Sequence, residues 1–370
     1  MSRKSTALSC LVFTFLILSS FPISLLAQIR LDTVGDDALT IKGQWFLSYQ
    51  AGNVKEQDFN QFLLKRGYIT VERNLSSKIT GRITPDISVD REGDGMGDIE
   101  LRLKYCYLKY NLPNSAIFTK PSIEFGLAHR PWLDFEEHIN RYRVQGTMFL
   151  ERNNIFNSAD YGVTLVSYLG GEMDDEYQKN VSKSYPGKYG SLAIGIYNGG
   201  GYHAIEKNTN KTIEGRLTVR PLIQSIPGLQ LTYLGAFGKG NTESAPDWAL
   251  NAGFLSWENQ NFVLTGMYFS CEGNSFGSAV QSFGEPIKQD GYSIFGELKL
   301  CSQKFSVIAR HDYFNSKIKP NKISTNRYIT GLAYHFLKGC KIVLDYDTVE
   351  TNEVNKNRDS IYELAVEVHY

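Results

Sequence analysis

The sequence predicts an all-β fold, a transmembrane antiparallel β-barrel of about 16 strands with a long loop folded into its lumen. Three observations carry this prediction. Runs of about ten residues alternate between apolar and polar side chains, the chain ends on such a run, and it begins with a secretory signal. Successive side chains of a strand point to opposite faces, so each run predicts a strand with one apolar face. Strands can span lipid only as a closed barrel, because an open sheet would leave backbone groups unpaired.

The first residues of the chain have the features of a cleaved signal peptide. Two positive residues precede an apolar stretch from Ala7 to Phe21, and Ala27 supplies a small residue at the cleavage point. This stretch is shorter than the roughly 20 apolar residues of a membrane-spanning helix. We therefore expect residues 1–27 to be removed and residues 28–370 to form one barrel domain.

The last strand runs from Ile361 to Tyr370 and alternates without a break. Apolar and aromatic side chains occupy one face, whereas Glu363, Glu367 and His369 occupy the other. A chain that ends on an aromatic residue of such a strand is typical of bacterial outer-membrane barrels. We therefore expect this protein in the bacterial outer membrane, in contact with its lipid.

The composition fits a barrel wall and disfavours several other classes. Tyr (22) and Phe (21) are abundant, as expected where aromatic rings mark the membrane interfaces; Tyr105, Tyr107 and Tyr370 are predicted to face lipid in this way. Removing Arg3 and Lys4 with the signal peptide leaves 37 of the 39 basic residues against 39 acidic ones, so we expect no nucleic-acid partner. The sequence has no Cys-x-x-Cys pair or other metal-ligand spacing, and we expect neither a metal nor a cofactor.

The predicted strands are separated by turn-forming residues, and an even number of them suits antiparallel closure. Short turns such as 74–77 are expected at the periplasmic end, and longer polar loops such as Gly171–Tyr185 at the outer end. The sixteen strands are predicted near residues 45–49, 67–71, 78–90, 99–107, 122–129, 161–170, 188–198, 211–222, 229–239, 248–258, 262–271, 291–301, 304–314, 327–337, 341–348 and 361–370.

One segment, residues 130–160, breaks the alternation. The spacing of Leu133, Glu136 and Ile139 within it is compatible with one or two short helices. Long structured loops are usually functional, and this one mixes aromatic and charged residues. We predict a constriction loop that folds into the lumen. The alternative is an external cap that takes no part in transport.

Charged side chains predicted to face the lumen are the candidates for selectivity. Pores select small ions through rings or rows of charge, narrowest where a loop constricts them. Opposed acidic and basic rows create a transverse field that orients polar solutes. The alternative is that these charges only pair with each other and hold the loop to the wall. The predicted wall residues are Arg66, Lys78, Arg82, Arg102, Lys104, Arg216 and Arg220, and the predicted loop residues are Arg130, Asp134, Glu136, Glu137, Arg141, Arg143, Glu151 and Arg152.

Motifs in the first half of the chain resemble those of the phosphate-selective porin O and P family. They lie in Lys65–Val71, Leu75–Thr84, Phe125–Trp132 with Glu136, Phe149–Arg152 and Tyr161–Val163. The resemblance implies a 16-stranded barrel, often trimeric, whose third extracellular loop dips into the channel and narrows it. It also implies that arginine and lysine side chains draw phosphate through the pore.

The resemblance therefore implies passive diffusion of small hydrophilic solutes, including anions such as phosphate or polyphosphate. Two alternatives stay open: an outer-membrane barrel enzyme that acts on lipid, and a plugged structural or adhesion barrel. The chain contains no Gly-x-Ser-x-Gly nucleophile motif and no His-Glu-x-x-His motif, so we expect no catalytic residues and no enzyme.

Overall fold

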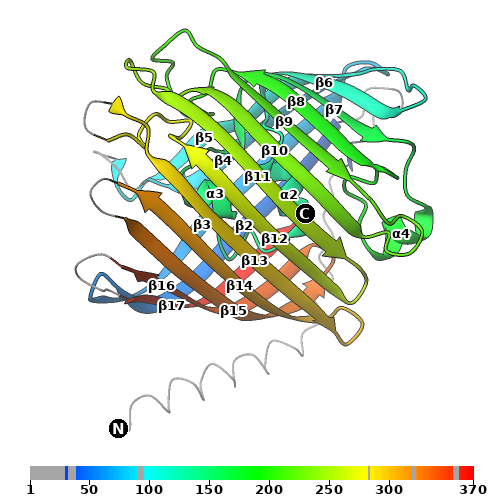
Figure 1. Cartoon of the computed structure of the whole chain (residues 1–370). Coiled ribbons are helices and arrows are strands. Elements are labelled where there is room, and N and C mark those ends of the chain that lie inside the picture. Colours follow the sequence, from blue (N-terminus) through cyan, green and yellow to red (C-terminus); the bar gives the residue numbers. More distant parts are fainter. Residues whose placement is uncertain (1–29, 32–38, 91–94, 282–283, 319–321, 353–357) are drawn as a thin grey trace.

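The computed structural model of the chain is a single antiparallel barrel (Figure 1). It describes residues 30–31, 39–90, 95–281, 284–318, 322–352 and 358–370. The predicted signal peptide, residues 1–27, lies outside them. Within the described residues, sixteen long strands, β2 to β17, form the wall, and the two-residue strand β1 pairs with β2.

The strands follow one another in chain order around the barrel, and three short helices lie in the connections between them. The strands are β1 (Arg30–Leu31), β2 (Leu39–Val54), β3 (Gln57–Asn74), β4 (Ile79–Val89), β5 (Ile99–Asn111), β6 (Phe118–His129), β7 (Ala159–Leu169), β8 (Gly190–Tyr197), β9 (Thr212–Val219), β10 (Leu229–Lys239), β11 (Asp247–Glu258), β12 (Phe262–Glu272), β13 (Lys288–Leu300), β14 (Phe305–Lys317), β15 (Ile323–Leu337), β16 (Cys340–Thr351) and β17 (Arg358–His369). The helices are α2 (Leu133–Ile139), α3 (Phe149–Arg152) and α4 (Asp175–Asn180).

The barrel closes where the last strand meets the first long one. β17 pairs with β2 in an antiparallel register that runs from Ser360 opposite Asn53 to His369 opposite Gln44. Trp45 Nε1 donates a hydrogen bond to the Tyr370 hydroxyl at 3.1 Å on the outer face of this seam. The predicted fold class, a closed 16-stranded antiparallel barrel, is confirmed.

The outer face of the wall is apolar and the inner face is largely buried. On β10, the side chains of Leu231, Tyr233 and Phe237 point outward and are about half exposed, whereas Thr232 and Leu234 point inward and are buried. Because an exposed apolar band of this kind is costly in water, lipid is its natural solvent. None of the helices in the described residues is long and apolar enough to cross a membrane.

Two of the β-bulges in the described wall each insert a lysine. Phe46 pairs with Arg66 but Leu47 pairs with Leu64, so Lys65 is an extra residue on β3. In the same way, Lys104 is an extra residue on β5, where the pairing partners of β4 skip it. A bulge shifts every later side chain of its strand to the other face.

The bulge on β5 overturns one prediction. Before it, Ile99, Leu101 and Leu103 face outward and are exposed. After it, Tyr105 and Tyr107 are 6% and 7% exposed and lie on the inner face, so the prediction that they face lipid is wrong. Simple alternation could not reveal this, because the extra residue is visible only in the pairing of two strands.

The connection between β7 and β8 also lies at a different end from the one expected. Residues 170–189 leave β7 beside the short turn between β5 and β6: Gly170 N donates to Ile117 O at 2.8 Å, and Lys120 Nζ lies 2.9 Å from Glu172. The predicted outer loop Gly171–Tyr185 is therefore at the end of the barrel that holds the short turns. We call this the turn end.

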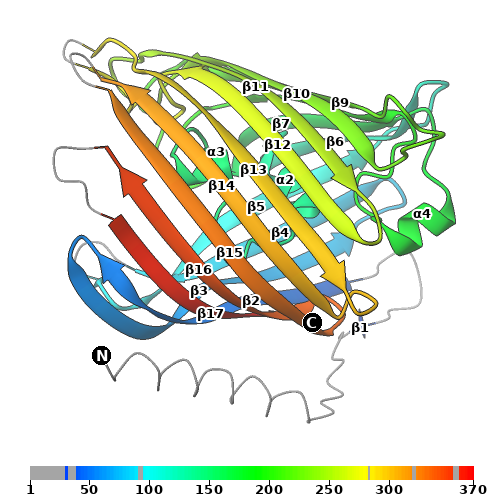
Figure 2. The ribbon, with the colours of Figure 1, turned by 60° about the horizontal axis from the view of Figure 1, so that its bottom comes forward.

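The segment between β6 and β7 forms two short helices, α2 and α3. In both views these helices lie between opposite walls of the barrel, whereas α4 lies at its rim (Figures 1 and 2). We call residues 130–158 the inner loop.

Candidate functional site

One side of the inner loop packs on the apolar inner wall of β11 to β13. The Trp132 ring meets Phe254 edge-on, with ring centroids 5.1 Å apart. Phe149 meets Phe269 at 5.5 Å, and both rings are fully buried. Burying large aromatic side chains in this way contributes several kcal/mol to the seating of the loop, by roughly 25 cal/mol per Å² of apolar surface.

Polar contacts fasten the same loop to β13, β14 and β16. The Tyr142 hydroxyl donates to Glu297 at 2.7 Å, and Arg152 lies 3.3 Å from Asp312. Gln145 is the junction of this network. Its amide nitrogen donates to Asp347 at 3.1 Å, and its amide oxygen accepts from Arg152 at 3.2 Å.

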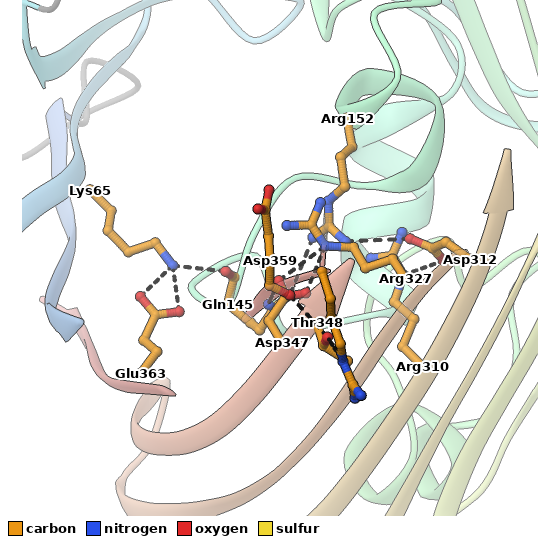
Figure 3. Close-up of polar contacts among 11 residues, drawn as sticks. Lys65, Gln145, Arg152, Arg310, Asp312, Arg327, Asp347, Thr348, Asp359 and Glu363 are labelled. Atoms are coloured by element: carbon orange, nitrogen blue, oxygen red, sulfur yellow. Dashed lines mark hydrogen bonds and ion pairs between the residues drawn. The ribbon is translucent and has the colours of Figure 1, made fainter. Parts of the chain in front are cut away.

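The tip of the inner loop reaches the closing seam of the barrel. The Lys65 ammonium donates to the carbonyl oxygens of Val144 and Gln145 at 2.6 and 2.7 Å, and to Glu363 on β17 at 2.7 Å (Figure 3). The bulge on β3 supplies this lysine, and the last strand supplies its carboxylate. The loop therefore spans the lumen from β6 to the β17–β2–β3 seam, and the part of the lumen it leaves lies toward β3 to β7.

The wall on that side carries cations that rest on tyrosine rings. The Arg82 guanidinium carbon lies 4.9 Å from the ring centre of Tyr105 and 6.0 Å from that of Tyr107. The Lys104 ammonium lies 4.6 Å from Tyr68 and 5.5 Å from Tyr105. Among the described residues, neither cation has a carboxylate at ion-pair distance. Arg82 lines a polar cavity of the lumen, whereas Lys104 is 6% exposed among the tyrosine rings.

The loop carboxylates opposite them are paired within the molecule. Glu137 accepts from Arg143 at 3.1 Å, and Arg143 also lies 3.5 Å from Glu151. Asp134 accepts from the Tyr185 hydroxyl at 2.6 Å. Arg143 thus bridges the two glutamates, and the Tyr185 hydroxyl holds the Asp134 carboxylate in place.

A polar cavity of about 840 Å³ opens between this wall and α2 at the turn end of the barrel. Arg82, Tyr107, Asp134, His138 and Tyr185 line it together with lysine, asparagine and threonine side chains. It is large enough for hydrated ions and small polar solutes.

The predicted wall residues divide into three groups. Arg82 lines the cavity and Lys104 is buried on the same wall, and neither has a carboxylate at ion-pair distance. Arg66 and Arg102 face inward but pair with Asp86 at 2.8 Å and Glu100 at 2.5 Å. Lys78, Arg216 and Arg220 do not line the passage: Lys78 is exposed in the turn between β3 and β4, whereas Arg216 and Arg220 are 1% and 4% exposed and bonded to connecting segments.

Several predicted loop residues also have anchoring positions instead of passage-lining ones. Arg130 is buried and bonded to Glu214, with its guanidinium 4.6 Å from the Phe156 ring. Arg141 pairs with Glu258 at 3.2 Å. The register of the facing strands places these carboxylates, and alternation within one strand could not predict the pairs.

Glu136 is buried on the packed side of α2. It is 5% exposed and accepts a hydrogen bond from Trp132 Nε1 at 2.7 Å. Burial raises the pKa of Glu136 to about 7, partly opposed by Arg310 and by the Trp132 hydrogen bond. This carboxyl therefore changes charge near neutral pH, while its neighbours on the helix face the passage.

Sequence reasoning missed Lys65, Tyr68 and Tyr185 as site residues. Strict alternation would place one of the adjacent residues Lys65 and Arg66 on the outer face, and the bulge brings both to the inner face. Tyr185 belongs to the connection that was expected at the other end of the barrel. No local pattern marks either residue, because both are brought to the inner loop by contacts between distant segments.

No family model matches the chain, and no curated protein matches it. Solved structures share its fold. The outer-membrane channel DcaP of Acinetobacter baumannii has a TM-score of 0.62 at 12% identity, covering 93% of this chain and 100% of that one. An anion-selective porin from Comamonas acidovorans has a TM-score of 0.61 at 8% identity, covering 90% and 100%. The trimer form of OmpT, an outer membrane protein of Vibrio cholerae, has a TM-score of 0.57 at 10% identity, covering 91% and 100%.

At these identities the likeness establishes the fold and not the activity. The chain has the fold of outer-membrane porins, a fold that belongs to the bacterial outer membrane.

Proposed function

We propose that this protein is an outer-membrane porin through which small hydrophilic solutes diffuse passively, with a preference for small anions such as phosphate. The observation that carries the proposal is the pair of cations Arg82 and Lys104, neither with a carboxylate at ion-pair distance, on the wall that the inner loop leaves free. Positive side chains beside a narrow passage raise the local concentration of anions and lower that of cations.

The wall cations also suit repeated passage rather than tight capture. Arg82 and Lys104 lie on tyrosine rings, which partly satisfy a cation without neutralising its charge. Conduction requires binding that is favourable enough for entry and weak enough for release. Two separated cations of this kind meet both requirements.

Membership of the phosphate-selective porin O and P family remains part of this proposal. The porin fold and the basic wall support it, as does the anion-selective porin from Comamonas acidovorans among the solved structures of this fold. A homotrimer is proposed on similar grounds, since OmpT of Vibrio cholerae has a trimer form.

We do not propose an enzyme. Among the described residues, a serine and a histidine are in hydrogen-bond contact at Ser306 and His335, 3.1 Å apart. Ser306 is 1% exposed on the inner wall and donates to Glu297 at 2.8 Å. Because a hydroxyl has one hydrogen, a serine that donates to a carboxylate is not activated by the histidine. This arrangement favours a structural role for the pair.

Single-channel recording in planar lipid bilayers tests the proposal. The purified protein should give discrete conductance steps, and its reversal potential in a potassium chloride gradient should indicate anion preference. The double variant Arg82→Gln/Lys104→Gln should keep the steps and lose the preference. Lys78→Gln is the matched control, because that lysine is exposed in a turn, and it should leave the reversal potential unchanged. A well-folded protein without conductance steps would rule out the channel.

A further inference from the structure

The connection between β7 and β8, residues 170–189, is a structured element and not an open loop. α4 begins after Asp174, whose carboxylate accepts from Tyr177 N at 2.7 Å. Beside the helix the two arms of the segment bond to each other: Met173 N donates to Pro186 O at 2.7 Å. We call this element the turn-end segment.

Two arginines fasten the turn-end segment to the rest of the barrel. Arg220, the residue after β9, donates to Gly187 O at 3.1 Å and to the Tyr177 hydroxyl at 3.2 Å. Arg141 of the inner loop donates to Val181 O at 3.2 Å and pairs with Glu258 on β11. The segment is therefore held from the wall and from the loop at once.

Tyr185 joins the turn-end segment to α2. Its hydroxyl donates to Asp134 Oδ2 at 2.6 Å, and its ring meets Phe135 edge-on at 5.1 Å. The Arg216 guanidinium lies 4.1 Å from the Phe135 ring and 5.1 Å from the Tyr185 ring, and Arg216 Nε donates to Pro131 O at 2.8 Å. One buried cation thus connects the turn-end segment to the start of α2.

Asp134 lines the cavity at the turn end. The groups that face it are Glu137 and His138 on its own helix, Arg82, Glu124, His129 and Arg216 on the wall, and Tyr185 on the turn-end segment. Burial would raise the pKa of Asp134, but His138, His129 and the Tyr185 hydrogen bond together hold it well below its usual range. The carboxylate is therefore kept ionised in the lining of this cavity.

We infer that Tyr185 is a positioning residue through which the turn-end segment seats α2 and fixes the Asp134 carboxylate in the lining of the cavity at the turn end. This inference rests on the proposed function for its effect on ion selectivity, but the seating of the helix does not depend on conduction. The porin would then have two inner elements, the inner loop and the turn-end segment, that set its charge together.

The first experiment measures selectivity against pH. Tyr185→Phe removes one hydrogen bond to the carboxylate, so Asp134 should take up its proton at a pH higher by roughly one unit. As pH falls and Asp134 takes up its proton, anion preference should rise, and the pH at which it rises should be higher in Tyr185→Phe by the same amount. Reversal potentials measured at a series of pH values report this change. Asp134→Asn should remove the part of that rise that occurs at the lowest pH, and the double variant should behave like Asp134→Asn alone. Tyr189→Phe, an exposed tyrosine of the same segment, should match the wild type.

The second experiment needs no conduction. Tyr185→Ala removes the ring that packs on Phe135 and Arg216, so trypsin should cleave the folded protein after Arg141 or Arg143 several times faster than it cleaves the wild type or Tyr189→Ala. If the wild type fails to conduct but this difference appears, the proposed function fails and the positioning role stands. If cleavage and the pH profile of the Tyr185 variants both match the wild type in a conducting protein, the positioning role is overturned and the channel stands.

Discussion

The two halves of the lumen are built from strands of the same kind and have opposite characters. On β11 to β14, apolar and paired inward side chains hold the inner loop through contacts such as Trp132 with Phe254 and Arg152 with Asp312. On β3 to β6, the inner face carries tyrosines and cations, and Arg82 and Lys104 lack carboxylate partners. The first of these two halves of the wall holds the inner loop, and the second borders the part of the lumen that the loop leaves open.

The difference shows that a polar inner face does not by itself identify a pore. Arg130 and Lys104 look alike in sequence as inward cations, but Arg130 has Glu214 at ion-pair distance, whereas Lys104 rests on aromatic rings without a carboxylate at that distance. A paired and buried cation holds structure together, whereas an unpaired one attracts ions. The presence of a partner, and not the residue type, separates the two halves.

Removing the main aromatic anchor of the seat should have the largest effect. Trp132→Ala deletes a fully buried ring and should destabilise the seated loop by about 3–5 kcal/mol, since large-to-small changes in a core leave a cavity. The loop should then become sensitive to trypsin, and single-channel conductance should rise, while the barrel keeps its circular-dichroism signal. Trp45→Ala, on the outer face, is the control. A loop that stays protected in Trp132→Ala would contradict the apolar seat.

Breaking the junction between the halves should have the next largest effect. Lys65→Met leaves Glu363 buried without its cation and should loosen the loop tip by about 3 kcal/mol or more. Hydrogen exchange at Val144 and Gln145 measures this, and should accelerate. The double variant Lys65→Met/Glu363→Leu removes both charges and should recover much of the protection. Equal loss in the single and double variants would show that the ion pair is not what holds the tip.

Changing one free cation on the solute side should affect selectivity more than structure. Lys104→Gln should lower the anion-to-cation permeability ratio by roughly two- to fivefold, the effect of one unit charge a few Å away in a hydrated passage. Melting and trypsin resistance should stay as in the wild type. The matched change on the seat, Arg152→Gln, should do the reverse, loosening the loop with less effect on ion preference. The same response in both variants would remove the distinction between the halves.

The smallest expected effect is a dependence of the seat on pH. The pKa of Glu136 in the packed loop, about 7, lies above the ordinary value of a glutamate. The free energy that Glu136 contributes to packing of the loop is therefore fully present below that ordinary value and is lost as pH rises through about 7. The protection factors of the α2 amides, which correct the exchange rate for its intrinsic dependence on pH, should therefore be lower at pH 8.5 than at pH 5. Glu136→Gln, which cannot ionise, should abolish this difference. A helix equally protected at both pH values would show that Glu136 does not control its seating.

Much of the wall was predictable because it depends on local alternation. The strand near Ile361–Tyr370 and the helical spacing of Leu133, Glu136 and Ile139 both appear in the structure as β17 and α2. The side on which Tyr105 and Tyr107 lie was not predictable, since one bulged residue in the pairing of β4 with β5 reverses the face.

The site was predictable only as a set of inward charges near one irregular loop. Arg82 and Lys104 were among the predicted wall residues, but so were Arg216 and Arg220, which hold connections in place. Nothing in their local sequence separates these pairs. Each ion pair joins residues from strands or loops far apart in the chain, and its formation depends on how those segments meet.

The sequence by itself determined a closed antiparallel barrel with an apolar outer face and one interrupted segment. The period of a strand and the apolar pattern are local properties that any stretch of chain displays. Tertiary structure alone decided which half of the lumen the inner loop occupies, which lysines the bulges insert, and which cations stay unpaired. Those outcomes depend on strand register and on contacts across the barrel, where a shift of one residue turns a side chain from lipid to lumen.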